Sequence, residues 1–104
     1  MNQKELLNRI KLDISAKDSR AEAYLFGSRA RGDHRPDSDW DILILVDEDT
    51  VTMDIENKFR DDLYELELES GQAISIFIYP KEYWKNTLVY SPLYTNVSRE
   101  GIQL

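Results

Sequence analysis

Apolar residues recur along this chain with two different periods, which together predict helices alternating with strands. A spacing of three and four residues predicts amphipathic helices over residues 3–16 and 51–68. Their apolar faces carry Leu6, Leu7, Ile10 and Ile14 in the first helix and Ile55, Phe59, Leu63 and Leu66 in the second. Three strands are predicted: a short one over residues 21–26 that ends at Gly27, an apolar one over 40–46, and one over 73–79 that is rich in β-branched and aromatic residues. The middle run is apolar on both faces, so we expect it at the centre of a sheet covered on both sides.

Turn and capping residues mark the limits of the longer elements. The polar segment 28–38 contains Gly32 and Pro36 and predicts a short helical turn followed by a loop. The long second helix is expected to be capped by Thr50 or Asp49, and Gly71 follows its end.

Two further helices are predicted after the last strand. Pro80 suits the first position of a helix that runs to about Thr87. Ser91-Pro92 predicts the cap and first position of a last helix that ends at Gly101. The order of elements is then α-β-α-β-α-β-α-α. This order predicts an α/β (α+β) fold in which a small mixed sheet is flanked by helices.

Length and composition limit the classes of protein to which this chain can belong. The 104 residues suit a single domain over 1–104 with a thin core, which leaves room for a homo-oligomer or a protein partner. The absence of cysteine excludes disulfides, thiol nucleophiles and Cys-ligated metals. The longest purely apolar run, residues 42–46, is too short to span a membrane, and the chain begins without a basic apolar leader. We therefore expect a cytoplasmic protein that does not contact a membrane.

Charge is distributed unevenly along this acidic chain. The formal net charge is −7, so long-range repulsion opposes broad contact with phosphate backbones, and no direct nucleic-acid binding is expected. Residues 20–35 nevertheless carry four arginines against two acids, whereas residues 47–69 carry ten acids against two basic residues. A locally basic loop on an acidic protein suits a small polyanion better than a long one.

One segment combines the residue types that bind phosphate and a divalent cation. Gly27-Ser28 ends the first predicted strand, and Asp39-x-Asp41 follows after ten residues, where a polar loop enters the central strand. Residues i and i+2 of a strand project to the same face, so both carboxylates are expected in one crevice at the edge of the sheet. Two other Asp-x-Asp pairs occur, and we interpret the later one, Asp47/Asp49, as solvated turn and capping residues.

The two halves of this segment complement each other chemically. Neighbouring carboxylates repel unless a cation neutralises them, and oxygen ligation by few protein groups suits Mg²⁺ that also binds substrate phosphates. Glycine lets the backbone approach a phosphate, while the next amide groups, a serine hydroxyl and an arginine would bind its oxygens. The candidate metal-binding and catalytic residues are Asp39 and Asp41. The candidate phosphate-binding residues are Gly27, Ser28, Arg29 and Arg31.

Each of these residues taken alone has an ordinary structural explanation. Gly-Ser pairs are common in turns, and arginines on a polar loop are more often solvated than catalytic. Trp40 alternates away from the two aspartates and is expected to pack in the core. Only the joint arrangement of strand, Gly-Ser, ten residues, Asp-x-Asp and apolar strand favours nucleotide chemistry.

This joint arrangement resembles a known family. Gly27-Ser28 and Asp39-x-Asp41, with Arg29-Ala-Arg31-Gly32 and Arg35-Pro36-Asp37-Ser38 between them, are similar to the motif of minimal nucleotidyltransferases of the DNA polymerase β superfamily. They are similar in particular to the small MNT-type antitoxins that accompany HEPN-domain ribonuclease toxins. The resemblance implies the nucleotidyltransferase (polymerase β palm-like) fold, ATP with Mg²⁺, and transfer of AMP onto a tyrosine of the partner toxin. It also implies that Gly27 and Ser28 form the phosphate turn and that Asp39 and Asp41 bind the metal.

The chain departs from this family at one position. Active members place a third acidic residue beside the pair on the next strand, whereas residues 74–78 contain no acid. Ser75 is the expected occupant of that position, and a neutral serine is no general base at pH 7 without help. Glu67 or Glu69, at the end of the preceding helix, are alternative acids for the site.

Three functions are compatible with these features. The first, which we favour, is an adenylyltransferase that modifies a protein partner. The second is a degenerate nucleotidyltransferase module that neutralises or regulates a partner by binding it, and the missing acid favours this hypothesis. A late group of aromatic residues also favours it, namely Tyr83, Trp84, Tyr90 and Tyr94. The third, transfer to a small molecule such as an aminoglycoside, requires a second substrate domain for which the chain is too short.

Overall fold

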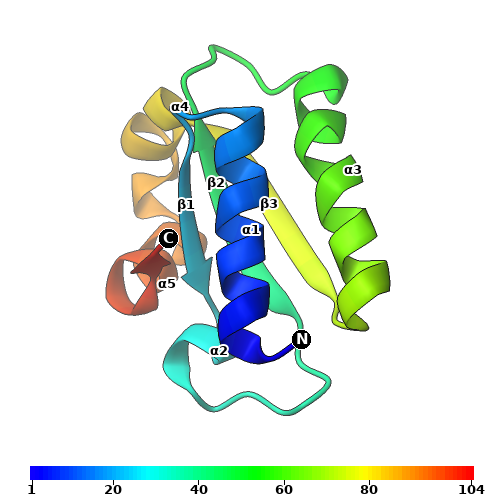
Figure 1. Cartoon of the computed structure of the whole chain (residues 1–104). Helices are drawn as coiled ribbons and strands as arrows, with labels where there is room; N and C mark the ends of the chain where they lie inside the picture. The colour runs from blue at the N-terminus through cyan, green and yellow to red at the C-terminus, as the bar shows by residue number, and fades with distance from the viewer.

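A four-stranded mixed sheet with helices on both faces forms the fold in the computed structural model, which describes all 104 residues (Figure 1). In chain order the elements are α1 (Gln3–Lys17), β1 (Glu22–Phe26), α2 (Ser28–Arg31), β2 (Trp40–Val46), α3 (Met53–Ser70), β3 (Ile74–Pro80), α4 (Lys81–Asn86), the 3₁₀ helix η1 (Leu88–Tyr90), α5 (Pro92–Glu100) and β4 (Ile102–Gln103). The predicted fold class and the predicted order of the first seven elements are confirmed.

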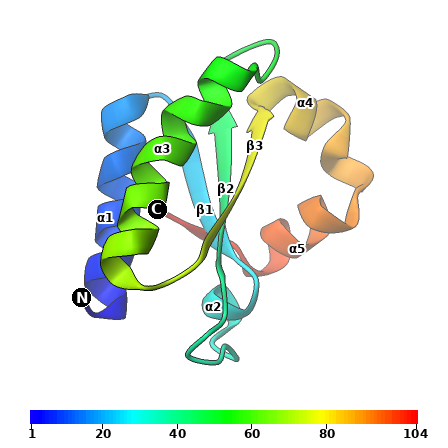
Figure 2. The same ribbon diagram turned by 90° about the vertical axis from the view of Figure 1, so that its right-hand side faces the viewer.

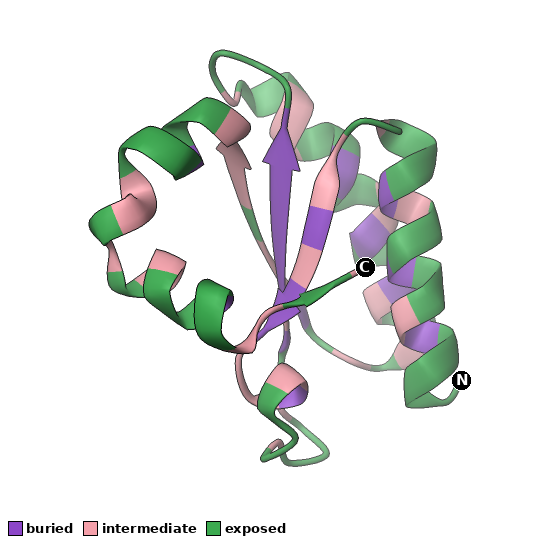
Figure 3. Ribbon diagram, turned by 90° about the vertical axis from the view of Figure 1, so that its left-hand side faces the viewer, coloured by how far each residue is buried: buried purple, intermediate pink, exposed green.

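The sheet has the order β3-β2-β1-β4. β2 runs parallel to β3 and antiparallel to β1, and β1 also pairs antiparallel with β4. The interior position predicted for the second strand is confirmed, because every residue of β2 except Asp41 is buried (Figure 3). In this register Asp41 is flanked by Phe26 on one neighbouring strand and by Ser75 on the other.

Two apolar clusters cover the two faces of the sheet. α1 and α3 pack on one face, and α4, η1 and α5 lie over the other (Figure 2). Ile42, Ile44 and Val46 belong to the first cluster, whereas Leu43 and Leu45 belong to the second. Because side chains alternate along a strand, Asp41 lies on the same face as Leu43 and Leu45, beneath the C-terminal helices. The Asp41 carboxylate therefore faces the α4–α5 side of the sheet.

Several predicted element limits are confirmed and two are wrong. Gly71 ends α3 in the left-handed conformation, and the Ser91 hydroxyl caps α5. The cap of α3 is Thr52, whose hydroxyl accepts a hydrogen bond from the Ile55 amide at 3.3 Å, and not Thr50 or Asp49. The start is later because Val51 belongs to the connection and packs against the first apolar cluster.

Pro80 closes β3 instead of occupying the first position of α4. Its backbone is extended at ψ 141°, and it remains in register with Val46, so it is the residue before the helix. The two-residue strand β4 was not predicted, because so short a segment shows no alternation. Across the whole chain, no helix combines the length and the apolar character that crossing a membrane requires.

Candidate functional site

Asp41 lies directly against the backbone of Gly27. The pairing of β1 with β2 sets Phe26 opposite Asp41, which brings the turn after β1 beside that carboxylate. A Cβ atom built on Gly27 would lie 2.3 Å from Oδ2 of Asp41, so only glycine at this position leaves space for the Asp41 side chain. Gly27 also has φ +76° and ψ −160°, a conformation that is essentially restricted to glycine. Ser28 follows as the first residue of α2.

Asp39 shares this face with Asp41 and Ser75. The Ser75 hydroxyl donates a hydrogen bond to Oδ2 of Asp39 at 3.1 Å. Ser75 is also the register partner of Asp41 across β2 and β3, and partners in a sheet project to the same side. The structure therefore brings together Gly27, Asp39 and Asp41 as the sequence predicted, with Ser75 beside the two acids.

Neither of the acids proposed as substitutes from α3 reaches this group. The Glu67 carboxylate accepts a hydrogen bond from the Ile74 amide at 3.0 Å, and Glu69 pairs with Arg9 on α1 at 3.4 Å. No cluster of three or more His, Cys, Asp or Glu side chains able to hold a metal ion is present in the chain. The site thus offers two carboxylates and a hydroxyl.

The two carboxylates of the site raise each other's electrostatic cost. Burial raises the pKa of the Asp41 carboxyl above its ordinary value, and the negative charge of Asp39 raises this pKa further. The Arg31 guanidinium acts in the opposite direction, and Glu100 adds a smaller unfavourable charge. A cation between the two aspartates would relieve this repulsion. Two carboxylates suit Mg²⁺, which accepts few protein ligands and keeps water and phosphate oxygens as the others.

Arg31 is the arginine that lies at this site. Its Nη1 donates to Oε2 and Oε1 of Glu100 at 3.0 and 3.2 Å, and its Nε donates to Oδ2 of Asp33 at 3.1 Å. These hydrogen bonds raise the pKa of Arg31, so it stays charged. Its side chain remains about half exposed, at 47%.

Arg29 points away from the site, so the phosphate-binding role predicted for it is corrected. It is only 7% exposed, and its guanidinium donates to the carbonyl oxygens of Pro36 and Ser38 and to the side chain of Gln72 at 3.0 to 3.3 Å. It also lies over the ring of Trp40, 4.6 Å from the centroid. Trp40 is buried at 3% exposure, which confirms its predicted packing role. Residues two apart on a helix point roughly 200° apart, so Arg29 and Arg31 cannot both face Asp41.

This placement predicts a structural defect on substitution of Arg29. Arg29→Lys keeps the charge but loses the planar fork, and the carbonyls of Pro36 and Ser38 lose donors. We expect the free energy of unfolding in urea to fall by about 1–3 kcal/mol, with MgATP binding of the folded protein unchanged. Arg35→Lys, at an exposed position of the same loop, is the matched control. Weaker MgATP binding at unchanged stability would instead show that Arg29 binds a phosphate of the nucleotide.

Glu100 is the site residue that sequence reasoning missed. It is the last residue of α5, its side chain is 12% exposed, and Oε1 accepts a hydrogen bond from the Gly27 amide at 3.1 Å. Residues 27 and 100 are far apart in sequence, and the packing of α5 on the sheet together with the pairing of β4 with β1 brings them together. That two-residue strand carries no periodic signal from which the contact could be predicted.

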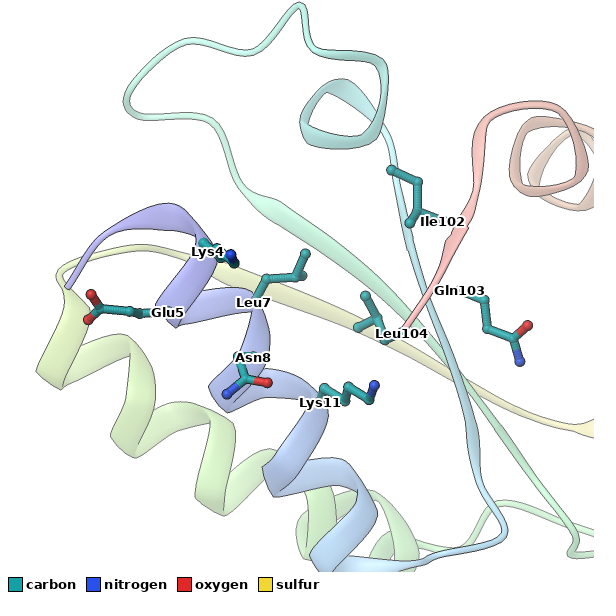
Figure 4. A pocket seen from close by; sticks show the side chains of 8 residues that line it. All are labelled: Lys4, Glu5, Leu7, Asn8, Lys11, Ile102, Gln103 and Leu104. Carbon is teal, nitrogen blue, oxygen red and sulfur yellow. The ribbon is translucent and has the colours of Figure 1, made fainter.

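The largest hollow on the molecule lies elsewhere. A groove of about 460 Å³ runs between α1 and the C-terminal residues, with Leu7 and Leu104 inside it and Lys4 and Lys11 along one side (Figure 4). It contains none of the predicted site residues. Leu7 and Leu104 pack against the α1–α3 cluster, on the opposite face of the sheet from Asp41.

The fold and the arrangement around Gly27 define the class of minimal nucleotidyltransferases. Residues 7–96 match the family model described as the nucleotidyltransferase domain, which is most of the chain. The chain belongs to this family, as the sequence motif predicted.

Individual relatives agree with this assignment. Over 46 residues the chain is 50% identical to "Putative protein adenylyltransferase MJ0141" of Methanocaldococcus jannaschii, an alignment that covers 42% of this chain and 46% of that protein. The chain thus covers less than half the length of that relative. A solved structure described as "Structure of putative minimal nucleotidyltransferase" superposes with a TM-score of 0.66 at 26% identity, over 100% of this chain and 97% of the other.

A toxin–antitoxin crystal structure with AMP-PNP has the same fold. It superposes with a TM-score of 0.66 at 21% identity, over 92% of this chain and 69% of the other. A mutant of the toxin–antitoxin MntA-HpeT gives a TM-score of 0.60 at 19% identity, over 100% of this chain and 72% of the other. At these identities the likeness establishes the fold alone.

Proposed function

We propose that this chain transfers AMP from ATP to a hydroxyl group of a partner protein, in a reaction that requires Mg²⁺. The observation that carries this proposal is the Asp41 carboxylate packed on the Gly27 bend, with Asp39 on the same face. The name of the M. jannaschii relative and the AMP-PNP in a structure of the same fold support it.

The residues of the site fit a magnesium ion that is shared with the substrate. Asp39 and Asp41 would hold the ion, and water and phosphate oxygens would complete its ligands, because no third acid is present. When bound, the ion would neutralise the two carboxylates and offset the charge that develops on the phosphates.

The remaining residues would bind and orient the triphosphate. The bare Cα of Gly27 lets a phosphate come close to the backbone, and the Ser28 hydroxyl and the Arg31 guanidinium would donate to its oxygens. In the reaction an acceptor oxygen forms a bond to the α-phosphorus while the bond from that phosphorus to the bridging oxygen breaks. Pyrophosphate leaves, and the hydroxyl proton passes to water. Ser75 contributes no base to this step.

A toxin of the HEPN type is the partner we propose, with a tyrosine as acceptor. Two structures of the same fold are of toxin–antitoxin pairs, which supports this assignment. The late aromatic residues divide between core and surface. Trp84 is buried and contacts the half-buried Tyr94, whereas Tyr83 and Tyr90 are 44% and 92% exposed. Tyr83 and Tyr90 are therefore available to a partner protein.

The transfer is tested by incubating the chain with ATP, Mg²⁺ and a toxin of the HEPN type. The toxin should gain the mass of one AMP at a tyrosine, and Asp39→Ala or a chelator should prevent the gain. A toxin whose mass is the same with the wild type and with Asp39→Ala would end this proposal.

A second function, neutralisation of the partner by binding alone, is favoured by Ser75. A hydroxyl that donates to Asp39 stands where active relatives are expected to carry an acid. In this case Asp39→Ala would still bind the toxin and suppress its activity in cells. If Asp39→Ala binds the toxin but no longer suppresses it, the binding-only function is excluded.

Ser75→Asp provides a direct test of the metal site. It adds a third carboxylate beside Asp39 and opposite Asp41, so stability without metal should fall through repulsion between like charges. Mg²⁺ should bind about tenfold more tightly, because affinity for hard cations rises with the number of charged ligands. Calorimetry with Mg²⁺ alone measures this change, with Ser75→Asn as the uncharged control of equal size. Equal Mg²⁺ affinity of the two variants would place the metal away from Ser75.

A further inference from the structure

The C-terminal residues bring a carboxylate to the Gly27 bend through strand pairing. β4 lies antiparallel to β1, with Ile102 opposite Leu25 and Gln103 opposite Tyr24. Continuing this register by two residues sets position 100 opposite position 27. The Leu104 amide extends the pairing at the other end by donating to the Ala23 carbonyl at 2.9 Å.

Gly101 makes the switch from helix to strand possible at this position. Its amide donates to the Val97 carbonyl at 2.7 Å, which completes the last turn of α5. A Cβ atom there would lie 2.4 Å from that carbonyl oxygen, so another residue would push the end of the helix away. Glu100 is therefore held in place on both sides, by the helix before it and by the paired strand after it.

The Glu100 carboxylate bridges the Gly27 amide and the Arg31 guanidinium. Oε1 accepts from the Gly27 amide at 3.1 Å, and Oε1 and Oε2 both accept from Arg31 Nη1, at 3.2 and 3.0 Å. Its low exposure strengthens these contacts, because a carboxylate shielded from water interacts more strongly with its partners. Gly27 adopts a conformation restricted to glycine next to Asp41, and the Gly27 amide donates a hydrogen bond to Glu100. Glu100 therefore contacts the backbone at the bend itself.

We propose that Glu100 is a positioning residue for nucleotide binding, which clamps the Gly27 bend and orients Arg31 toward the phosphates. This inference rests on the proposed function. Both oxygens are engaged by protein donors, so the residue acts through Gly27 and Arg31 and does not replace the missing third acid. Together with Asp33, it also balances the charge of Arg31.

The test measures MgATP binding by calorimetry for the wild type, Glu100→Gln and Glu100→Ala. Glutamine keeps an acceptor for the Gly27 amide but loses the ion pair, and we expect about tenfold weaker binding, as for other residues that orient a ligand-binding group. Alanine should weaken binding further. Glu65→Gln, at an exposed position of α3, is the control and should bind as the wild type does. Glu100→Gln should melt close to the wild-type temperature, so it decides the question even if Glu100→Ala does not fold.

A double-mutant cycle separates positioning from general structure. In an Arg31→Gln background, Glu100→Gln should lose most of its effect on MgATP affinity, because its charged partner is gone. The amide proton resonance of Gly27, recorded without nucleotide, should shift in Glu100→Ala, which reports the contact independently of ATP.

Two results would contradict the role of Glu100 and leave the proposed function standing. One is wild-type affinity for MgATP in Glu100→Gln. The other is tighter binding in that variant, which would mean that the carboxylate competes with phosphate for Arg31. A wild-type protein that binds no MgATP would instead remove the proposed function and the role of Glu100 together.

Discussion

Asp41→Asn is expected to abolish AMP transfer while making the protein without metal more stable at neutral pH. The carboxylate is half-buried and makes no hydrogen bond within the protein, and burial and the charge of Asp39 outweigh the favourable charge of Arg31. Asparagine has nearly the same shape but no charge, so the repulsion disappears and the metal site loses a ligand. Transfer should fall at least about 10³-fold, since a bound metal ion contributes several kcal/mol to such reactions.

The stability gain has a defined dependence on pH. Because burial and Asp39 raise the pKa of Asp41 in the folded protein, the protonated form favours folding, and this contribution is complete below the ordinary value of 3.8. It is lost as the pH rises through the raised pKa. Wild type and Asp41→Asn should therefore differ little in stability at acid pH, and the variant should become the more stable of the two as the carboxyl ionises.

Urea unfolding across this pH range measures the difference, with Asp49→Asn as the exposed control. Mg²⁺ should raise the stability of the wild type and leave Asp41→Asn unchanged. A variant that is less stable than the wild type at neutral pH would contradict this account, because it would show that the Asp41 charge is favourable in the fold.

Gly27→Ala is expected to give the largest loss of both stability and nucleotide binding. The conformation at φ +76° and ψ −160° costs a residue with a side chain about 1–3 kcal/mol. The new Cβ would also lie 2.3 Å from the Asp41 carboxylate and force it out of place. The substitution therefore damages the phosphate turn and the metal site together.

Gly32→Ala is a closely matched control for this prediction. Gly32 has φ +86°, but no atom lies within 4 Å of the position that a Cβ would take there. Alanine at this position therefore costs only the backbone strain of about 1–2 kcal/mol. Thermal unfolding and MgATP calorimetry should show a modest loss of stability with normal binding. Equal binding by Gly27→Ala and Gly32→Ala would mean that the space between Gly27 and Asp41 has no part in the site.

The parts of the fold that follow from local patterns were predicted from the sequence. The apolar run of β2 indicated a buried central strand, and the position of Asp39-x-Asp41 at its start indicated that both carboxylates share a face with the Gly27 bend. These features depend on the alternation of one strand and on its pairing with a neighbour. The structure places them accordingly.

The features that were missed depend on contacts between distant segments. Arg29 and Arg31 look equivalent in sequence, but their side chains point about 200° apart on α2, so Arg29 turns into the loop and lies over the ring of Trp40. Glu100 reaches the site because α5 packs on the sheet and two residues of β4 pair with β1. Neither the direction of a four-residue helix nor the register of a two-residue strand leaves a periodic signal in the sequence.

The most direct test of the site is a crystal structure with Mn²⁺ and a non-hydrolysable ATP analogue. The anomalous signal of the metal should lie between the carboxylates of Asp39 and Asp41, with the triphosphate on the Gly27-Ser28 bend and one phosphate in contact with Arg31. A metal ion coordinated by other acids, or a triphosphate bound away from that bend, would contradict the assignment of these residues.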